Sequence, residues 1–169
     1  IVVGAGLAGI SVATQFVASC VNLAVLEQRT MAGGVWSAFG NAFSRVNSTE
    51  PGYRLRLKER PSVNTNHSHC HEILLDCARA IEQFSLGEVT YFGVKVFGIA
   101  PADPGPSWQL GCHWQSKAYK AISCAWTVLC TNRRLGAPRF LPVAGEESFG
   151  GQIRRGVSND SCDVLWTSR

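Results

Sequence analysis

Three glycines close to the start of the chain restrict the folds that are open to it. They follow the strand-like run Ile1–Val3 and precede a stretch with helical periodicity that reaches about Cys20. Between a strand and a helix, the first glycine of Gly-x-Gly-x-x-Gly permits a tight turn, the second lets the backbone approach a pyrophosphate, and the third lets helix and strand pack closely. The phosphates then lie on the helix amino terminus, whose dipole and unpaired N–H groups favour negative charge. The pattern predicts a dinucleotide site that includes Gly4, Ala5, Gly6, Ala8 and Gly9.

An acidic residue at the end of the next strand fits the same site. The run Asn22–Glu27 gives the order strand, helix, strand, which is typical of a parallel sheet, and Glu27 stands 18 residues after Gly9. A carboxylate there can accept hydrogen bonds from both ribose hydroxyls of an adenosine. It would repel a 2′-phosphate, so FAD or NAD is favoured over NADP at this site. The alternative is a glycine turn in an unrelated α/β domain, with the acidic residue there by chance.

The rest of the chain alternates loops with regular elements. Residues 31–61 are rich in glycine, proline, asparagine and serine, so we expect mostly loop, and residues 69–86 have the apolar periodicity of a second helix. Strand-like runs follow at residues 89–92, 94–99, 108–114 and 119–124, and their spacing predicts a small antiparallel meander. The continuous apolar run Trp126–Cys130 is typical of a strand in the middle of a parallel sheet.

Composition and charge exclude several classes of protein. Hydrophobic residues make up 46% and charged residues 17% of the chain, which indicates one domain with an ordinary core. The net charge of +4 is dispersed except at Arg54, Arg56, Lys58 and Arg60. We interpret that cluster as a solvated face, since nucleic-acid binding needs a denser basic stripe. No run approaches the roughly 18 apolar residues of a membrane helix.

Cysteine and histidine usage bears on compartment and metals. The seven cysteines are odd in number and include no Cys-x-x-Cys pair, which favours free thiols, a reducing compartment and a cytoplasmic protein, and argues against a disulfide reductase. A zinc site is conceivable at His67, His69, Cys70 and His71, because His67 and His71 would share a helical face with Cys70 nearby. Solvated histidines at a helix start are commoner, so we expect no metal. The chain opens on the strand-like Ile1, so we expect its amino end to be cut.

The segment Gly33-Gly34-Val35-Trp36 resembles the Gly-Gly-x-Trp segment of the flavin-containing monooxygenases and their Baeyer–Villiger relatives. Four further stretches resemble that family in the same order along the chain, so the resemblance covers nearly all of it. They are the flavin-ring loop (residues 44–47 and 50–53), the strand whose backbone faces the adenine (94–96), the Ala/Cys-Thr-Gly turn (129–132) and the proline-rich crossover to the pyridine-nucleotide domain (138–142, 145–147 and 149–153).

The resemblance implies an α/β protein with a Rossmann-like FAD-binding domain, built on a parallel sheet with a βαβ start and a small antiparallel β-meander, incomplete at both ends. Residues 1–137 would form the first part of that domain, and residues 138–169 the crossover toward a missing NAD(P)-binding domain. Besides the glycine motif and Glu27, the resemblance implies FAD contacts from Gln28, Gly34, Val35, Trp36, Asn47, Val96 and Thr131.

Two of these residues have rival interpretations. Asn47 is the candidate for a hydrogen bond near the flavin C4a–N5 edge, and an asparagine that only shapes a turn fits equally well. Trp36 would pack beside the isoalloxazine or the ribityl chain, against the alternative of plain core packing.

The sequence departs from the family at two positions. The family's Phe-x-Gly-x-x-x-His pattern matches at Phe149 and Gly151, but Arg155 stands where the histidine belongs. Asn132 replaces a glycine in the Ala/Cys-Thr-Gly turn, and asparagine is well suited to a position of positive φ. The first departure puts the monooxygenase subtype and its coupling to NADPH in question.

By resemblance, the complete protein would use FAD, NADPH and dioxygen to oxygenate a small nucleophilic substrate, such as an amine, a thioether or a ketone. The NADPH motif would lie beyond Arg169, so we expect this chain alone to be inactive. Two alternatives stay open: a dinucleotide-binding module without catalysis of its own, and another FAD- or NAD(P)-dependent oxidoreductase.

Overall fold

The computed structural model describes residues 1–48, 53–55, 57, 67–114, 117–131, 141–151 and 153, with backbone alone at 118–121. One sheet has four short strands in the order β3-β2-β1-β7, and every neighbouring pair in it is parallel. Its strands are β1 (Val2–Val3), β2 (Val25–Glu27), β3 (Thr90–Phe92) and β7 (Val128–Leu129). The predicted α/β class with a parallel sheet is confirmed.

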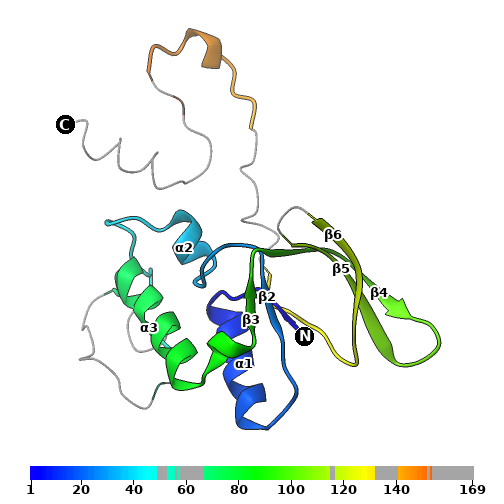
Figure 1. The fold of residues 1–169 in the computed structure, drawn as a ribbon. Coiled ribbons are helices and arrows are strands. Elements are labelled where there is room, and N and C mark those ends of the chain that lie inside the picture. The colour runs from blue at the N-terminus through cyan, green and yellow to red at the C-terminus, as the bar shows by residue number, and fades with distance from the viewer. Residues whose placement is uncertain are drawn as a thin grey trace.

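Three helices accompany this sheet. Helix α1 (Leu7–Ala18) links β1 to β2 and completes the predicted βαβ start, and α3 (Cys70–Gln83) lies beside it (Figure 1). The short α2 (Val35–Phe39) interrupts the stretch predicted as mostly loop. The described residues also include the single-turn 3₁₀ helices η1 (Leu86–Glu88) and η3 (Glu146–Ser148). Among the described residues, no helix combines the length and hydropathy needed to cross a membrane.

The predicted antiparallel meander is a second sheet of three strands. It consists of β4 (Val94–Ala102), β5 (Ser107–Trp114) and β6 (Lys117–Cys124), with β5 in the middle. The run at residues 89–92 was predicted to join this meander, and that prediction is wrong: β3 pairs in parallel with β2 in the first sheet. Gly93, with φ +73°, lies between the two sheets and lets the chain turn from β3 into β4.

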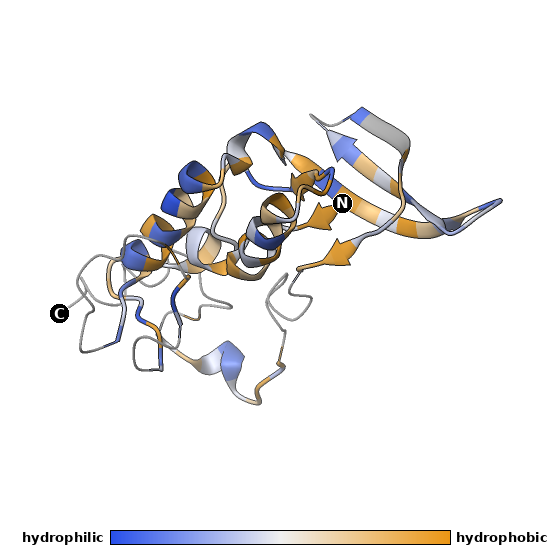
Figure 2. Cartoon of the chain, turned by 90° about the horizontal axis from the view of Figure 1, so that it is seen from below, coloured by the Kyte–Doolittle hydropathy of each residue, from blue (hydrophilic) through white to orange (hydrophobic). Residues whose placement is uncertain are grey.

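The alternating directions of side chains along the buried strands divide the hydrophobic core into two clusters. Val2 and Val25 pack toward helices α1 and α3, whereas Val3 and Leu26 pack toward the meander, where they meet Leu110. Because successive side chains of a strand point to opposite faces, the parallel sheet is covered on both sides. Figure 2 shows the consequence, since the central strands are largely orange while the helices alternate orange with blue. The sheet therefore sits between the two helices and the meander.

The run Trp126–Cys130 lies elsewhere than predicted. It contributes β7, which is the edge strand of the sheet among the described residues rather than a central one. Trp126 and Leu129 are 81% and 59% exposed there, because the residues described provide neighbours on one side only. The predictions made for Asn132, Arg155, Arg56, Lys58, Arg60 and residues 50–52 lie outside the described residues.

Candidate functional site

The chain turns from β1 into α1 at the glycine motif, where side chains at Gly4 and Gly9 would collide with nearby backbone atoms. Gly4 has φ +100°, and a Cβ on it would lie 2.6 Å from the carbonyl oxygen of Cys130. A Cβ on Gly9 would lie 1.8 Å from the carbonyl oxygen of Gly4. Gly6 is the N-cap of α1, and no side chain caps this helix terminus. The first N–H groups of a helix lack partners within the helix, so this end of α1 is suited to an anion.

Glu27 is held against this turn by backbone hydrogen bonds. One carboxylate oxygen accepts the N–H of Ala5 at 2.7 Å, and the other accepts the N–H of Arg29 at 2.9 Å. The residue is only 5% exposed. Because each carboxylate oxygen has a second acceptor site, the fixed carboxylate can still receive hydroxyl donors. The side chain at the end of β2 thus faces the glycine turn, as predicted from its spacing.

The segment Gly33-Gly34 packs directly on the glycine turn. The N–H of Gly33 donates to the carbonyl oxygen of Ala5 at 2.9 Å. Gly34 has φ +58°, and a Cβ on it would lie 2.9 Å from the Cα of Gly6. Helix α2 begins immediately afterwards at Val35. The two glycine segments, distant in sequence, form one backbone surface.

Trp36 is held by contacts along its side chain and backbone. Its indole N–H donates to the hydroxyl oxygen of Tyr53 at 3.2 Å, and the two rings meet edge to face with centroids 5.8 Å apart. The thiol of Cys70 donates to the carbonyl oxygen of Trp36 at 3.3 Å. The contact with Tyr53 restricts the indole ring, and the contact with Cys70 holds the backbone of Trp36.

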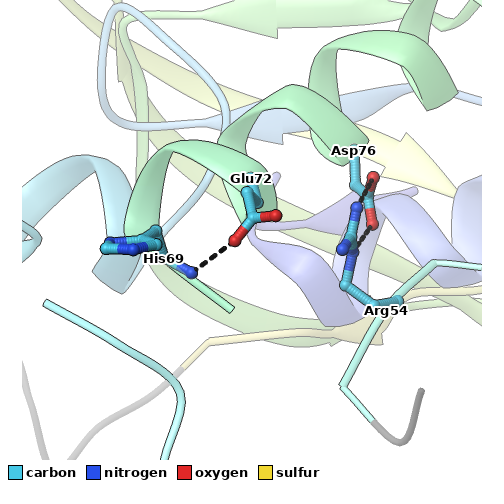
Figure 3. Close-up of polar contacts among 4 residues, drawn as sticks. All are labelled: Arg54, His69, Glu72 and Asp76. Carbon is cyan, nitrogen blue, oxygen red and sulfur yellow. Dashed lines mark hydrogen bonds and ion pairs between the residues drawn. The ribbon is translucent and has the colours of Figure 1, made fainter. Parts of the chain in front are cut away.

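The segment that carries Tyr53 is itself anchored by an ion pair (Figure 3). The guanidinium of Arg54 binds the carboxylate of Asp76 on α3 through two contacts of 2.5 and 2.8 Å, with side chains 5% and 3% exposed. The prediction of a solvated face is therefore wrong for Arg54. At the start of α3, the carboxylate of Glu72 accepts the N–H of His69 at 2.7 Å and stabilises the helix terminus.

These elements enclose a cavity of about 590 Å³ at the carboxyl ends of β1, β2 and β7. Its size is that of a cofactor or ligand site, and its place outside the strand ends is where open α/β sheets bind ligands. Ten of the thirteen predicted cofactor residues line it: Gly4, Gly6, Ala8, Glu27, Gln28, Gly34, Val35, Trp36, Val96 and Thr131.

The other three predicted residues lie outside the lining. Ala5 and Gly9 are buried just behind it, where Ala5 binds Glu27 and Gly9 packs on Gly4. Asn47 is exposed and does not line the cavity.

Several lining residues were not predicted as site residues from the sequence. Arg29, Phe39 and Tyr53 are the largest of them, and the guanidinium of Arg29 lies 5.8 Å from the centroid of the Phe39 ring. Arg29 could have been identified by its position two residues after Glu27 in the loop that follows β2. Tyr53 belongs to the stretch that resembles the flavin-ring loop, although it was not named as a contact residue. Phe39 had no such signal, because its place depends on how α2 packs.

The cysteine in the described lining of this cavity is poorly suited to nucleophilic or redox chemistry. Cys130 lines the cavity, and burial raises the pKa of its thiol above the usual range, so it stays protonated at neutral pH. Burial, and secondly the charge of Asp76, raises the pKa of Cys77 to about 12. Among the residues that the structure describes, no group of His, Cys, Asp and Glu could hold a metal ion. His69 and His71 instead stack on each other with ring centroids 5.2 Å apart.

The fold recurs in solved structures of monooxygenases. An oxidized steroid monooxygenase bound to NADP matches 84% of this chain with 27% of its own length, at a TM-score of 0.69 and 19% identity. A polycyclic ketone monooxygenase from the thermophilic fungus Thermothelomyces thermophila matches 76% with 22% of its length, at a TM-score of 0.67 and 16% identity. OTEMO in complex with FAD and NADP matches 89% with 28% of its length, at a TM-score of 0.65 and 18% identity.

Because the sequence identities are only 16–19%, this likeness establishes the fold and nothing further. The chain has the Rossmann-like α/β fold of one part of these monooxygenases, and the family resemblance seen in the sequence is confirmed at that level. The chain spans about a quarter of the length of the proteins it matches, between 22% and 28%. No protein-family model and no curated protein sequence matches it.

Proposed function

We propose that this chain binds FAD and forms the FAD-binding portion of a flavin-dependent monooxygenase that uses NADPH and dioxygen. The observation that carries the proposal is the contact between Glu27 and the N–H of Ala5, which places a fixed carboxylate at the rim of the glycine turn. This is the arrangement that grips the adenosine diphosphate half of a dinucleotide. The resemblance at Gly33–Trp36 favours FAD over NAD.

The residues present fit such a cofactor on three counts. Side chains are excluded at Gly4 and Gly34 by contacts of 2.9 Å or less, which keeps bare backbone along the cavity wall. The amino terminus of α1 has no side-chain cap and can receive the pyrophosphate. The buried carboxylate of Glu27 can accept the ribose hydroxyls, and its charge opposes a 2′-phosphate.

When bound, the flavin supplies the redox chemistry, and the protein supplies binding, orientation and exclusion of water. In our proposal the glycine turn and Glu27 hold the adenosine diphosphate half. Trp36, fixed by Tyr53, forms a wall for the ribityl chain or the flavin ring. The substrate would be a small nucleophile, such as an amine, a thioether or a ketone. Residues 1–137 would belong to the FAD domain and residues 138–169 would lead toward an NAD(P)-binding domain.

The binding step is tested on the chain itself. FAD is titrated into the protein while flavin fluorescence is followed, with ADP and riboflavin as competitors. We expect ADP to displace FAD and riboflavin to be a poor competitor, because riboflavin lacks the half that the site grips. A protein that bound NAD as tightly as FAD would support the alternative of a non-flavin oxidoreductase.

The catalytic step is tested on the natural gene product that carries this chain. Purified with FAD, it should lose its yellow colour when NADPH is added without oxygen and regain it in air. Bound FAD that NADPH never bleaches would remove the monooxygenase from consideration and leave a dinucleotide-binding module without catalysis of its own.

A further inference from the structure

We propose that Arg29 is a binding residue for the pyrophosphate of the dinucleotide and supplies the positive charge of the cavity. The inference rests on the proposed function, because it assumes that a dinucleotide is the ligand. It goes beyond that function in naming a residue outside the glycine motif that sets the affinity.

The charge of the cavity favours a role for Arg29 in binding an anion. Among the described residues that line it, Arg29 is the one basic side chain and Glu27 the one acidic side chain. Both oxygens of Glu27 are engaged by backbone N–H groups. Within the part of the chain that the structure describes, no carboxylate pairs with the guanidinium of Arg29. The guanidinium charge is therefore available to a ligand.

Hydrogen bonds hold the backbone of Arg29 beside the cavity. Its N–H donates to Glu27 at 2.9 Å, and its carbonyl oxygen accepts the N–H of Gly93 at 3.0 Å. The backbone of Arg29 is thus fixed on both sides, while the residue itself is exposed. Because the backbone is fixed, the long side chain can place its guanidinium only within a limited region, and that region includes the cavity wall.

The side chain of Arg29 contacts the ring of Phe39. The guanidinium lies over the Phe39 ring at 5.8 Å from its centroid, so the side chain extends from the loop after β2 to the end of α2. The negative face of an aromatic ring attracts a cation and restricts where it points. Phe39 also lines the cavity, and it holds the guanidinium at the cavity wall.

The negative charge of the ligand also favours a cation in the cavity. A pyrophosphate diester carries two negative charges, and a helix amino terminus offers only about half an elementary charge in return. The planar guanidinium presents donors that match two phosphate oxygens at once. Without Arg29, the charged side chains described in the lining would leave a net negative site, because Glu27 would remain alone.

The test compares four variants in FAD binding. Arg29→Gln should weaken FAD binding about tenfold or more, which is the loss expected for a hydrogen bond to a charged group. Arg29→Lys should recover part of the affinity, and Phe39→Leu should show a smaller loss than Arg29→Gln. Lys117→Gln removes the same charge from an exposed position on β6, away from the cavity, and should bind as the parent does. Circular dichroism verifies that each variant is folded.

Two further readouts distinguish a pyrophosphate contact from a general effect. The affinity of the parent for FAD should fall as salt rises, and Arg29→Gln should flatten that dependence. Calorimetry with ADP and with adenosine should show the loss for ADP alone. Equal losses for both ligands, or unchanged FAD affinity in Arg29→Gln, would overturn the role of Arg29 and leave FAD binding standing. A parent chain that binds no FAD would instead refute the proposed function.

Discussion

Gly6 and Gly34 lie against each other backbone to backbone, although 28 residues separate them in the chain. A Cβ on Gly34 would lie 2.9 Å from the Cα of Gly6, and a Cβ on Gly6 would lie 3.4 Å from the Cα of Gly34. The hydrogen bond from Gly33 to Ala5 fixes this approach. The Gly-x-Gly-x-x-Gly motif and the Gly-Gly-x-Trp segment are therefore two halves of one structure, and damage to either half disturbs the same cavity.

The first prediction concerns Gly34→Ala. The added methyl group meets the Gly6 backbone, and alanine is strained at φ +58°, so we expect a loss of about 1–3 kcal/mol in the free energy of unfolding. FAD affinity should fall as well. Urea unfolding measures the first effect and fluorescence titration the second. Gly87→Ala is the matched control, because nothing lies within 4 Å of a Cβ at Gly87 and its φ is not positive. A Gly34→Ala chain as stable as this control would contradict the packing.

The second prediction concerns the charge of Glu27. Glu27→Gln puts an amide group where two backbone N–H donors converge, so one former acceptor becomes a donor. We expect FAD binding to weaken by about 1.5–3 kcal/mol. The repulsion of a 2′-phosphate should also disappear, so NADP should compete better relative to NAD in the variant. Competition titrations measure that ratio. An unchanged ratio would show that the carboxylate does not face the ribose.

The third prediction concerns the ion pair of Arg54 and Asp76. Asp76→Ala removes the carboxylate that the buried Arg54 side chain contacts through two guanidinium nitrogens, and we expect a loss of about 3–5 kcal/mol in the free energy of unfolding. Replacing both residues in Arg54→Met/Asp76→Leu should be far milder, because the buried charge is removed together with its partner. Urea unfolding of the two variants supplies the measurement. Equal losses would mean that the charge itself contributes little.

The fourth prediction concerns alkaline pH. The pKa of Cys77 is raised from 9.0 to about 12 in the folded chain, by burial and then by Asp76. An unfolded thiol ionises near its usual pKa, so above about pH 9 deprotonation stabilises the unfolded state. The stability that Cys77 contributes is fully present below pH 9 and is lost as the pH rises toward 12.

Urea unfolding at pH 8 and pH 10 tests this dependence. We expect the parent chain to lose about 1–2 kcal/mol between the two values, at 1.36 kcal/mol for each unit of pKa difference. Cys77→Ala should lose less over the same interval, whatever its stability at pH 8. Cys70, Cys112 and Cys130 shift in the same direction, so some loss should persist. A slope that Cys77→Ala leaves unaltered would assign the loss to those thiols.

Much of the site was readable in the sequence because local rules govern it. A glycine turn between a strand and a helix, followed by an acidic residue at the next strand end, can be recognised from spacing alone. The backbone geometry of Gly4 and Gly9 leaves no room for a side chain, so the residue type itself carries the information. The meander was predictable for a similar reason, since its strands are neighbours in the chain.

Contacts between distant segments depended on packing and left no local signal. Nothing in the run at residues 89–92 distinguishes a parallel partner of β2 from a further meander strand. Sequence patterns relate only nearby residues, so they did not reveal the partner of Arg54, which is a carboxylate 22 residues later on α3. The contact of Tyr53 with Trp36 was not predictable either, because it depends on the ion pair of Arg54 and Asp76 that anchors the Tyr53 segment. Spacing along the chain thus specified the dinucleotide turn, and long-range packing specified the walls of the cavity around it.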